Sequence, residues 1–348
     1  MNEGTTSVAK IDPQTDALRT SPPPSLDRRQ ARAASYGPTF LDRYAGLIVL
    51  ALLLVVFSAL RPDTFMSAIT FRLLLSEQAV TGIAAIGLLI AFAGGSYDLS
   101  IGQVLGLAVV MSTWLQADRG LGPWTAVLIT LVLGALVGAV NGFLVSVVGI
   151  NSFIATLAMA SIVEAVIYGV TGGTQIVGSV AKGFLSAGQS DILTIPLPVF
   201  YMLGIAALAW FALEHTTPGR LLYAVGSNPD ASRLSGIRTG RYVFVSLVCS
   251  ASLATVAGIV FATKVGSASL TAGPPYLLPA FAAVLLGTTQ IRPGRANVLG
   301  TVLAIFLVAT GSKGLQLMGV PIWVSSLFNG TILIVAVALS LARRRVRR

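Results

Sequence analysis

Charged residues are scarce in this chain. Of its 348 residues only 10% are Asp, Glu, Lys or Arg, whereas 55% are hydrophobic, and the mean hydropathy is +0.84. Soluble globular domains carry about 25% charged residues. Too few charges are therefore present to cover a water-exposed surface of this size, and the composition predicts a protein embedded in a lipid bilayer.

Residues that hold metals or form disulfides are almost absent. The chain has one cysteine, Cys249, and one histidine, His215. Neither a disulfide within the chain nor a His/Cys metal site can be built from them. The sequence also lacks an HExxH motif and a paired acidic motif for Mg²⁺. We therefore predict no metal, no cofactor and no catalytic residue, which disfavours a membrane enzyme acting on a lipid.

The dipeptide Gly-Lys occurs nowhere in the sequence. Every P-loop contains it, because its lysine reaches the nucleotide phosphates. The chain therefore does not bind ATP through a P-loop, and an ATP-driven process would need a separate ATPase.

Long apolar runs fill most of the chain. A helix that crosses a bilayer needs about 17–25 apolar residues. The sequence predicts an all-α membrane protein with about ten transmembrane helices, and a shorter apolar stretch, Ser67–Leu75, is expected to be re-entrant or interfacial. The predicted spans are Tyr44–Leu60, Ala79–Ala93, Leu99–Leu115, Pro123–Val148, Ser152–Val170, Ile195–Leu213, Tyr242–Thr263, Tyr276–Leu286, Ala296–Ser312 and Ile322–Ala342.

Polar and basic segments flank the predicted membrane domain, residues 44–342. Residues 1–43 are polar and Pro-rich and are predicted to be a disordered tail, and residues 343–348 form a basic tail. Most arginines and lysines fall on one side if both termini are cytoplasmic, which the positive-inside rule favours. This arrangement puts the loop Thr171–Thr194 outside and the loop Glu214–Arg241 in the cytoplasm. The net charge of +10 thus flanks membrane spans, and nucleic-acid binding is not predicted.

Three acidic residues, Glu77, Asp98 and Glu164, lie within or beside predicted spans. Ionisable groups at membrane depth are costly and are candidates for function. Glu77 is expected at the membrane interface. Glu164 either faces a water-filled path or bonds a neighbouring helix.

Asp98 follows a predicted helix break at Gly94 and Gly95. Ser96, Asp98 or Ser100 can cap the next helix, because a short oxygen-bearing side chain accepts from free N–H groups. Broken helices at membrane depth also tend to line substrate paths. Asp98 is thus either a structural cap or a path residue.

The fourth predicted span repeats glycine at Gly134, Gly138 and Gly142. This spacing lets two helices approach closely in lipid. Asn141, next to them, either braces a neighbouring helix or contacts substrate.

The cytoplasmic loop is too long and too polar to be a simple connector. Pro218 and Gly219 precede a predicted helix over Arg220–Val225, and Pro229 starts a second short helix that ends at Gly236. Such a helix–turn–helix at the membrane surface is suited to docking a cytosolic partner, or else it is a basic anchoring loop.

From about Ala79 to the C-terminus the sequence resembles the permease subunits of ATP-binding-cassette importers of the ribose/xylose/galactose type. Four blocks carry the resemblance: GGSYDLSIGQVLGLA (Gly94–Ala108), Gly134–Met159, TTPGRLLYAVGSNPDASRLSGI (Thr216–Ile237) and Gly314–Pro321. The sequence departs from the family pattern at Asn151, where proline is usual, and at Leu286–Thr289, where Gly-Gly-Thr-Ser is usual.

The resemblance implies a type II-like importer fold in a multi-pass protein of the bacterial inner membrane. It implies a partner ABC ATPase, an extracytoplasmic sugar-binding protein, and pairing with a second permease as a homodimer or mixed pair. Proton-coupled secondary transport through Asp98 or Glu164 is the alternative. We expect the substrate path to include Asp98, Ser100, Asn141, Asn151, Thr156 and Glu164, and the ATPase contact to include Gly219, Arg220, Gly226, Asn228, Ala231, Leu234 and Gly236.

Overall fold

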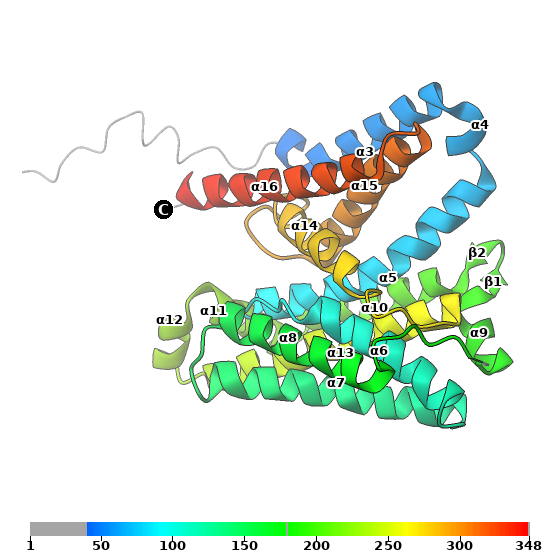
Figure 1. Cartoon of the computed structure of the whole chain (residues 1–348). Coiled ribbons are helices and arrows are strands. Elements are labelled where there is room, and N and C mark those ends of the chain that lie inside the picture. Colours follow the sequence, from blue (N-terminus) through cyan, green and yellow to red (C-terminus); the bar gives the residue numbers. More distant parts are fainter. Residues whose placement is uncertain (1–39, 179, 347–348) are drawn as a thin grey trace, which may run out of the picture.

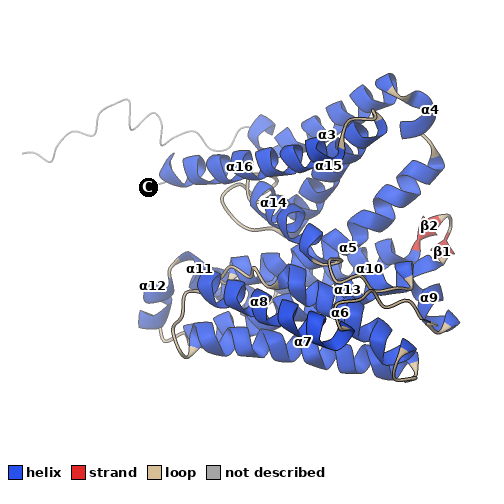
Figure 2. Ribbon diagram, in the orientation of Figure 1, coloured by secondary structure: helices blue, strands red, loops and turns tan. Residues whose placement is uncertain are grey.

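The computed structural model describes residues 40–178 and 180–346, and helices make up most of this part of the chain (Figures 1 and 2). One two-stranded antiparallel hairpin pairs Asp191 with Pro196 and Ile192 with Ile195. The elements are α3 (Phe40–Leu60), α4 (Pro62–Phe65), α5 (Ala68–Ala93), α6 (Ile101–Ala117), α7 (Pro123–Ser146), α8 (Ser152–Thr171), α9 (Lys182–Gln189), β1 (Asp191–Ile192), β2 (Ile195–Pro196), α10 (Leu197–His215), α11 (Thr217–Ser227), α12 (Pro229–Leu234), α13 (Thr239–Val265), η1 (Pro274–Tyr276), α14 (Leu277–Gly287), α15 (Val298–Leu317) and α16 (Ile322–Val346).

The prediction of a mostly helical protein with long apolar helices is confirmed. Within the described residues, six helices are long and apolar enough to cross a membrane, namely α5, α7, α8, α10, α13 and α15. Shorter apolar helices cover Tyr44–Leu60, Ile101–Ala117, Pro274–Gly287 and Trp323–Val335, where the remaining spans were predicted. The total of ten crossings stays a prediction.

The expectation of a separate re-entrant piece at Ser67–Leu75 is wrong. Ser67 caps α5, its Oγ accepting from the Thr70 amide at 3.2 Å, and the helix then runs without interruption to Ala93. No glycine or proline lies between Ser67 and Thr81, so nothing in the sequence stops the helix from propagating.

The first and last described helices extend slightly into the segments that were predicted to be tails. Helix α3 begins at Phe40, inside the segment expected to be disordered, and α16 continues to Val346 through much of the expected basic tail. Residues 1–39 and 347–348 lie outside the described residues, so the disorder predicted for 1–43 stays a prediction.

Helix α13 lies at the centre of one group of helices and packs against α5, α6 and α7. The glycine repeat of α7 faces it. A Cβ placed on Gly138 would come within 2.8 Å of the Val248 Cα, and one on Gly142 within 2.8 Å of the Phe244 ring. The close approach predicted from the repeat is confirmed, because only glycine leaves room for the neighbouring backbone.

A second group, formed by α3, α14, α15 and α16, lies beside the first (Figure 1). Helix α5 joins the two, since it packs against α10 and α13 on one side and α14 and α15 on the other. Helices α11 and α12 lie at one end of the bundle, near the C-terminus, whereas α9 and the hairpin lie at the opposite end (Figure 1).

Candidate functional site

The centre of the candidate site is the turn between α5 and α6. Gly95 adopts φ +83° there, a conformation that glycine reaches without strain. Asp98 follows and is fully buried, its Oδ1 accepting from the Ser100 amide at 3.0 Å and from the Ser100 hydroxyl at 2.5 Å. The Asp98 side chain therefore closes a turn onto Ser100, the residue that precedes α6, whereas no side-chain hydrogen bond caps the helix itself. The choice between a structural role and a path role for Asp98 stays a prediction.

Asn141 brings α7 into the same network. Its Nδ2 donates to the Ser100 hydroxyl at 2.9 Å, and its side chain is fully buried. Of the two alternatives left open by the sequence, the structure favours the helix brace. The Ser250 hydroxyl of α13 also faces the Asp98 carboxyl group without completing a hydrogen bond. Among the described residues, Asp98 Oδ2 and Asn141 Oδ1 have no hydrogen-bond partner.

Helix α8 holds the unwound segment before α6. The Leu99 amide donates to Thr156 Oγ1 at 3.0 Å, and the Tyr97 amide donates to Ser152 Oγ at 3.1 Å. These hydroxyls satisfy backbone groups that no helix can pair. Thr156 was predicted as a path residue, whereas Ser152 was missed; its place directly after the helix cap was the signal available in the sequence.

Asn151 and Glu164 lie outside this network. Asn151 is exposed and caps α8, its Oδ1 accepting from the Phe153 amide at 2.9 Å. Glu164 is exposed on α8 at the edge of a buried stripe that includes Val163 and Ile167, and it forms no ion pair with any described residue. An acidic group on an apolar helix needs water or a protein partner.

The predicted helix–turn–helix of the polar loop is confirmed. The Thr216 hydroxyl accepts from the Gly219 amide at 3.3 Å and starts α11, and Asn228 Oδ1 accepts from the Ala231 amide at 3.0 Å and starts α12. Gly236 follows α12 with φ +78°. Five of the seven residues expected to contact an ATPase are exposed, namely Arg220, Asn228, Ala231, Leu234 and Gly236.

The other two expected contact residues face the protein interior. Gly219 lies against the backbone of Ala212 and Leu213, and Gly226 lies against Ala93 and Gly95. Both allow a close approach of α11 rather than presenting a surface. Gly226 thereby brings α11 against the turn that leads into the Asp98 network.

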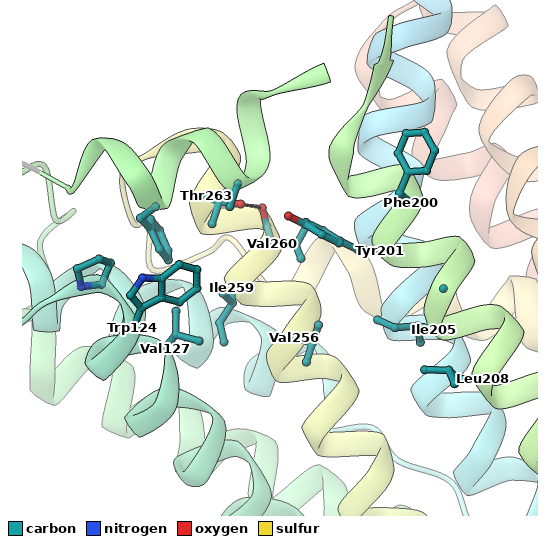
Figure 3. Close-up of a pocket in the computed structure, with 14 residues that line it drawn as sticks. Trp124, Val127, Phe200, Tyr201, Ile205, Leu208, Val256, Ile259, Val260 and Thr263 are labelled. Atoms are coloured by element: carbon teal, nitrogen blue, oxygen red, sulfur yellow. Dashed lines mark hydrogen bonds between the residues drawn. The ribbon is translucent and has the colours of Figure 1, made fainter. Parts of the chain in front are cut away.

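A cavity of about 480 Å³ opens between α7, α9, α10 and α13 (Figure 3). It contains none of the predicted path residues, and its lining is apolar and aromatic, with Trp124 and Tyr201 on facing helices (Figure 3). The Thr263 hydroxyl in its wall already donates to the Val260 carbonyl at 2.7 Å. This apolar pocket therefore offers little to a polar solute.

Known proteins resemble the chain over most of its length. The family model described as "Branched-chain amino acid transport system / permease component" matches residues 71–337. The ribose import permease protein RbsC of Escherichia coli (strain K12) is 31% identical over 303 residues, covering 86% of this chain and 93% of that protein.

Two further relatives have similar coverage. RbsC of Bacillus subtilis (strain 168) is 31% identical over 300 residues, covering 86% of this chain and 92% of that protein. The D-allose transport system permease protein AlsC of Escherichia coli (strain K12) is 28% identical over 301 residues, with the same coverage of 86% and 92%. A solved putative metal-chelate type ABC transporter aligns with 84% of this chain at a TM-score of 0.45 and 16% identity, a similarity too low to assign helices by.

Proposed function

This chain belongs to the branched-chain amino acid transport system / permease component family, and we propose that it is the membrane-spanning permease subunit of an ATP-binding-cassette importer for a monosaccharide or similar neutral polar solute. The proposed cargo class rests on the similarity to ribose and allose permeases, which extends over more than nine-tenths of their length. ATP hydrolysis then belongs to a separate subunit.

The polarity of the candidate site supports a neutral cargo over an amino acid. The buried network is built from hydroxyl and amide groups, and its one carboxylate, Asp98, already accepts two hydrogen bonds from Ser100. A zwitterionic amino acid would bring two charges that each need a partner, because unpaired charges away from water are costly. A sugar brings hydroxyls, which Ser, Thr and Asn side chains match.

The exposed face of α8 supports a paired permease. A lone glutamate facing lipid costs several kcal/mol, on the order of 3 kcal/mol at a helix centre, and Glu164 is exposed on that face. A second permease chain covering α8 would enclose a hydrated path bordered by Glu164 and Asn151. In this arrangement each chain has ten spans, a type II-like fold and both termini in the cytoplasm.

The two ends of the bundle suit the two soluble partners. At the end that carries α11 and α12, the Leu234 side chain is 90% exposed, an isolated apolar group on a polar surface that fits contact with an ATPase. At the opposite end, an Arg72–Asp191 ion pair ties the hairpin to α5, and the Ile176–Ala268 bridge holds the segment that precedes α9. We assign that end to the sugar-binding protein.

Reconstitution tests the proposal. The complex of this chain with its ATPase and binding protein is placed in proteoliposomes, and uptake of labelled D-ribose, D-allose and L-leucine is measured with ATP supplied to the ATPase side. We expect uptake of a monosaccharide that needs ATP and persists with an uncoupler. Uptake that collapses with the uncoupler at constant ATP supports proton coupling instead, and uptake of leucine alone contradicts the cargo class.

A further inference from the structure

Tyr223 of α11 contacts the turn that joins α14 to α15. Its hydroxyl donates to the Ala296 carbonyl at 2.8 Å, and the Arg295 guanidinium carbon lies 3.7 Å from the centre of its ring. Burial raises the pKa of Tyr223 to about 12, so the hydroxyl stays protonated and remains a donor at neutral pH. One side chain of α11 thus makes both a hydrogen bond and a cation–π contact with this turn.

Glu214, at the end of α10, forms ion pairs with the same turn. It pairs with Arg292 and, at 3.6 Å, with Arg295. The Glu214 side chain is only 7% exposed, whereas both arginines are partly exposed. An ion pair with a desolvated partner is screened less than one in open solvent, so this contact is more than an incidental surface pair.

Hydrogen bonds of Asn297 fix the turn to both helices that it joins, α14 and α15. Asn297 Nδ2 donates to the carbonyls of Gly287 and Gln290 at 3.0 and 3.2 Å, which closes the turn from within. Asn297 Oδ1 accepts from the Gly300 amide at 2.6 Å and caps α15. A displacement of the turn is therefore passed to both α14 and α15, and α15 in turn packs against α3 and α16.

We propose that Glu214, Tyr223, Arg292 and Arg295 form a clasp that transmits movement of α11 to α14 and α15 during the transport cycle. This inference rests on the proposed function, in which α11 belongs to the ATPase-coupling loop. The four are positioning residues and contact no substrate. Gly226 connects the same helix to the Asp98 turn, so α11 is joined to both helix groups at once.

If the clasp transmits movement, breaking it should uncouple sugar transport from ATP hydrolysis. Tyr223→Leu removes the hydroxyl and the ring, and we expect at least about a fivefold fall in sugar imported per ATP hydrolysed, the lower range of coupling energies between sites. Binding-protein-stimulated ATP hydrolysis should stay within about twofold of the wild type, because the docking surface is untouched. Tyr223→Phe keeps the ring over Arg295 and should recover most of the lost coupling. Tyr201→Leu, on α10 in the apolar pocket, is the matched control.

A double-mutant cycle tests the ionic half of the clasp. Glu214→Gln and Arg292→Gln should each lower the transport-to-hydrolysis ratio. The double variant should be no worse than Glu214→Gln alone, because that single substitution already removes the Glu214–Arg292 ion pair. Additive losses would contradict the clasp. Equal loss of hydrolysis and uptake in Tyr223→Leu would show a merely structural role and overturn the proposal.

Hydrogen exchange of the purified chain tests the clasp without any transport. We expect faster exchange over residues 288–297 in Tyr223→Leu but not in Tyr201→Leu, because local protection reports the contacts that hold a segment. Unchanged exchange there overturns the clasp even if the complex transports sugar. A wild-type complex that transports nothing, with exchange behaving as expected, overturns the proposed function and leaves the clasp as a structural contact only.

Discussion

Gly226 of α11 lies directly against the backbone of Ala93, in the last turn of α5, and leaves no room for a Cβ. A Cβ there would also come within 2.8 Å of the Gly95 amide nitrogen. The polar loop and the helix break before Asp98 are therefore in backbone contact. A displacement of α11 would therefore press on the helix break before Asp98.

Gly226→Ala tests this contact. The added methyl group meets backbone atoms, which cannot rotate away, so we expect α11 to shift and uptake to fall by about tenfold or more, with a loss of stability of about 1–3 kcal/mol. Gly169→Ala in α8 is the matched control, because a Cβ there meets nothing within 4 Å. ATP-dependent uptake and thermal unfolding are the measurements, and wild-type behaviour of Gly226→Ala would contradict the close approach.

Asp98 is expected to tolerate asparagine but not leucine. Asparagine keeps an oxygen that accepts from the Ser100 amide and offers an N–H₂ to the Ser250 hydroxyl. Leucine leaves buried donors of Ser100 without an acceptor, which costs about 1–3 kcal/mol. Denaturation of the purified variants measures the difference. Equal stability of the two variants would show that the hydrogen bonds from Ser100 to this side chain do not stabilise the turn before α6.

Gly138→Ala is predicted to destabilise the contact between α7 and α13. Its new methyl group would lie 2.8 Å from the Val248 Cα and 3.0 Å from the Leu247 carbonyl oxygen, and overpacking of this kind costs about 1–3 kcal/mol. Gly204→Ala in α10 is the control, since its methyl group points into open space. A melting temperature for Gly138→Ala equal to that of the control would rule out tight packing here.

Filling the apolar pocket should leave transport intact. Gly204 lines the pocket and a Cβ placed on it meets nothing within 4 Å, so we expect Gly204→Leu to extend its side chain into the cavity. We expect sugar uptake within about twofold of the wild type, because a change of 0.4 kcal/mol is about twofold. Uptake abolished by Gly204→Leu in a normally folded protein would place the cargo path in this pocket.

Glu164→Gln separates a polar role from a charged one. If Glu164 borders a hydrated path for a neutral sugar, the amide keeps its hydrogen-bonding capacity and uptake should change by less than about threefold. Glu164→Leu should lower uptake more strongly. A proton relay requires an ionisable group, so complete loss of uptake in Glu164→Gln would favour the proton-coupled alternative.

Local sequence features determined much of the fold. Apolar run length predicted the helices, and the Gly134–Gly142 repeat predicted the close approach between α7 and a neighbouring helix, because these depend on composition and spacing within one segment. The cap at Asn228 follows from a short polar side chain beside a helix start. The error at Ser67–Leu75 came from treating a short apolar stretch as separate when nothing interrupts the helix.

Only the tertiary structure decided how distant residues meet. Asn141 lies next to Ser100, and Tyr223 lies next to Arg295, through helix packing that no local pattern encodes. For the same reason Gly219 and Gly226 looked like surface residues of the loop although both face the interior. The sequence alone determined a membrane protein and predicted that it lacks a P-loop, because composition and dipeptide content can be read without knowing how the chain folds. Which face of a helix packs against a neighbour depends on the positions of all the other helices, so it is determined only in the folded protein.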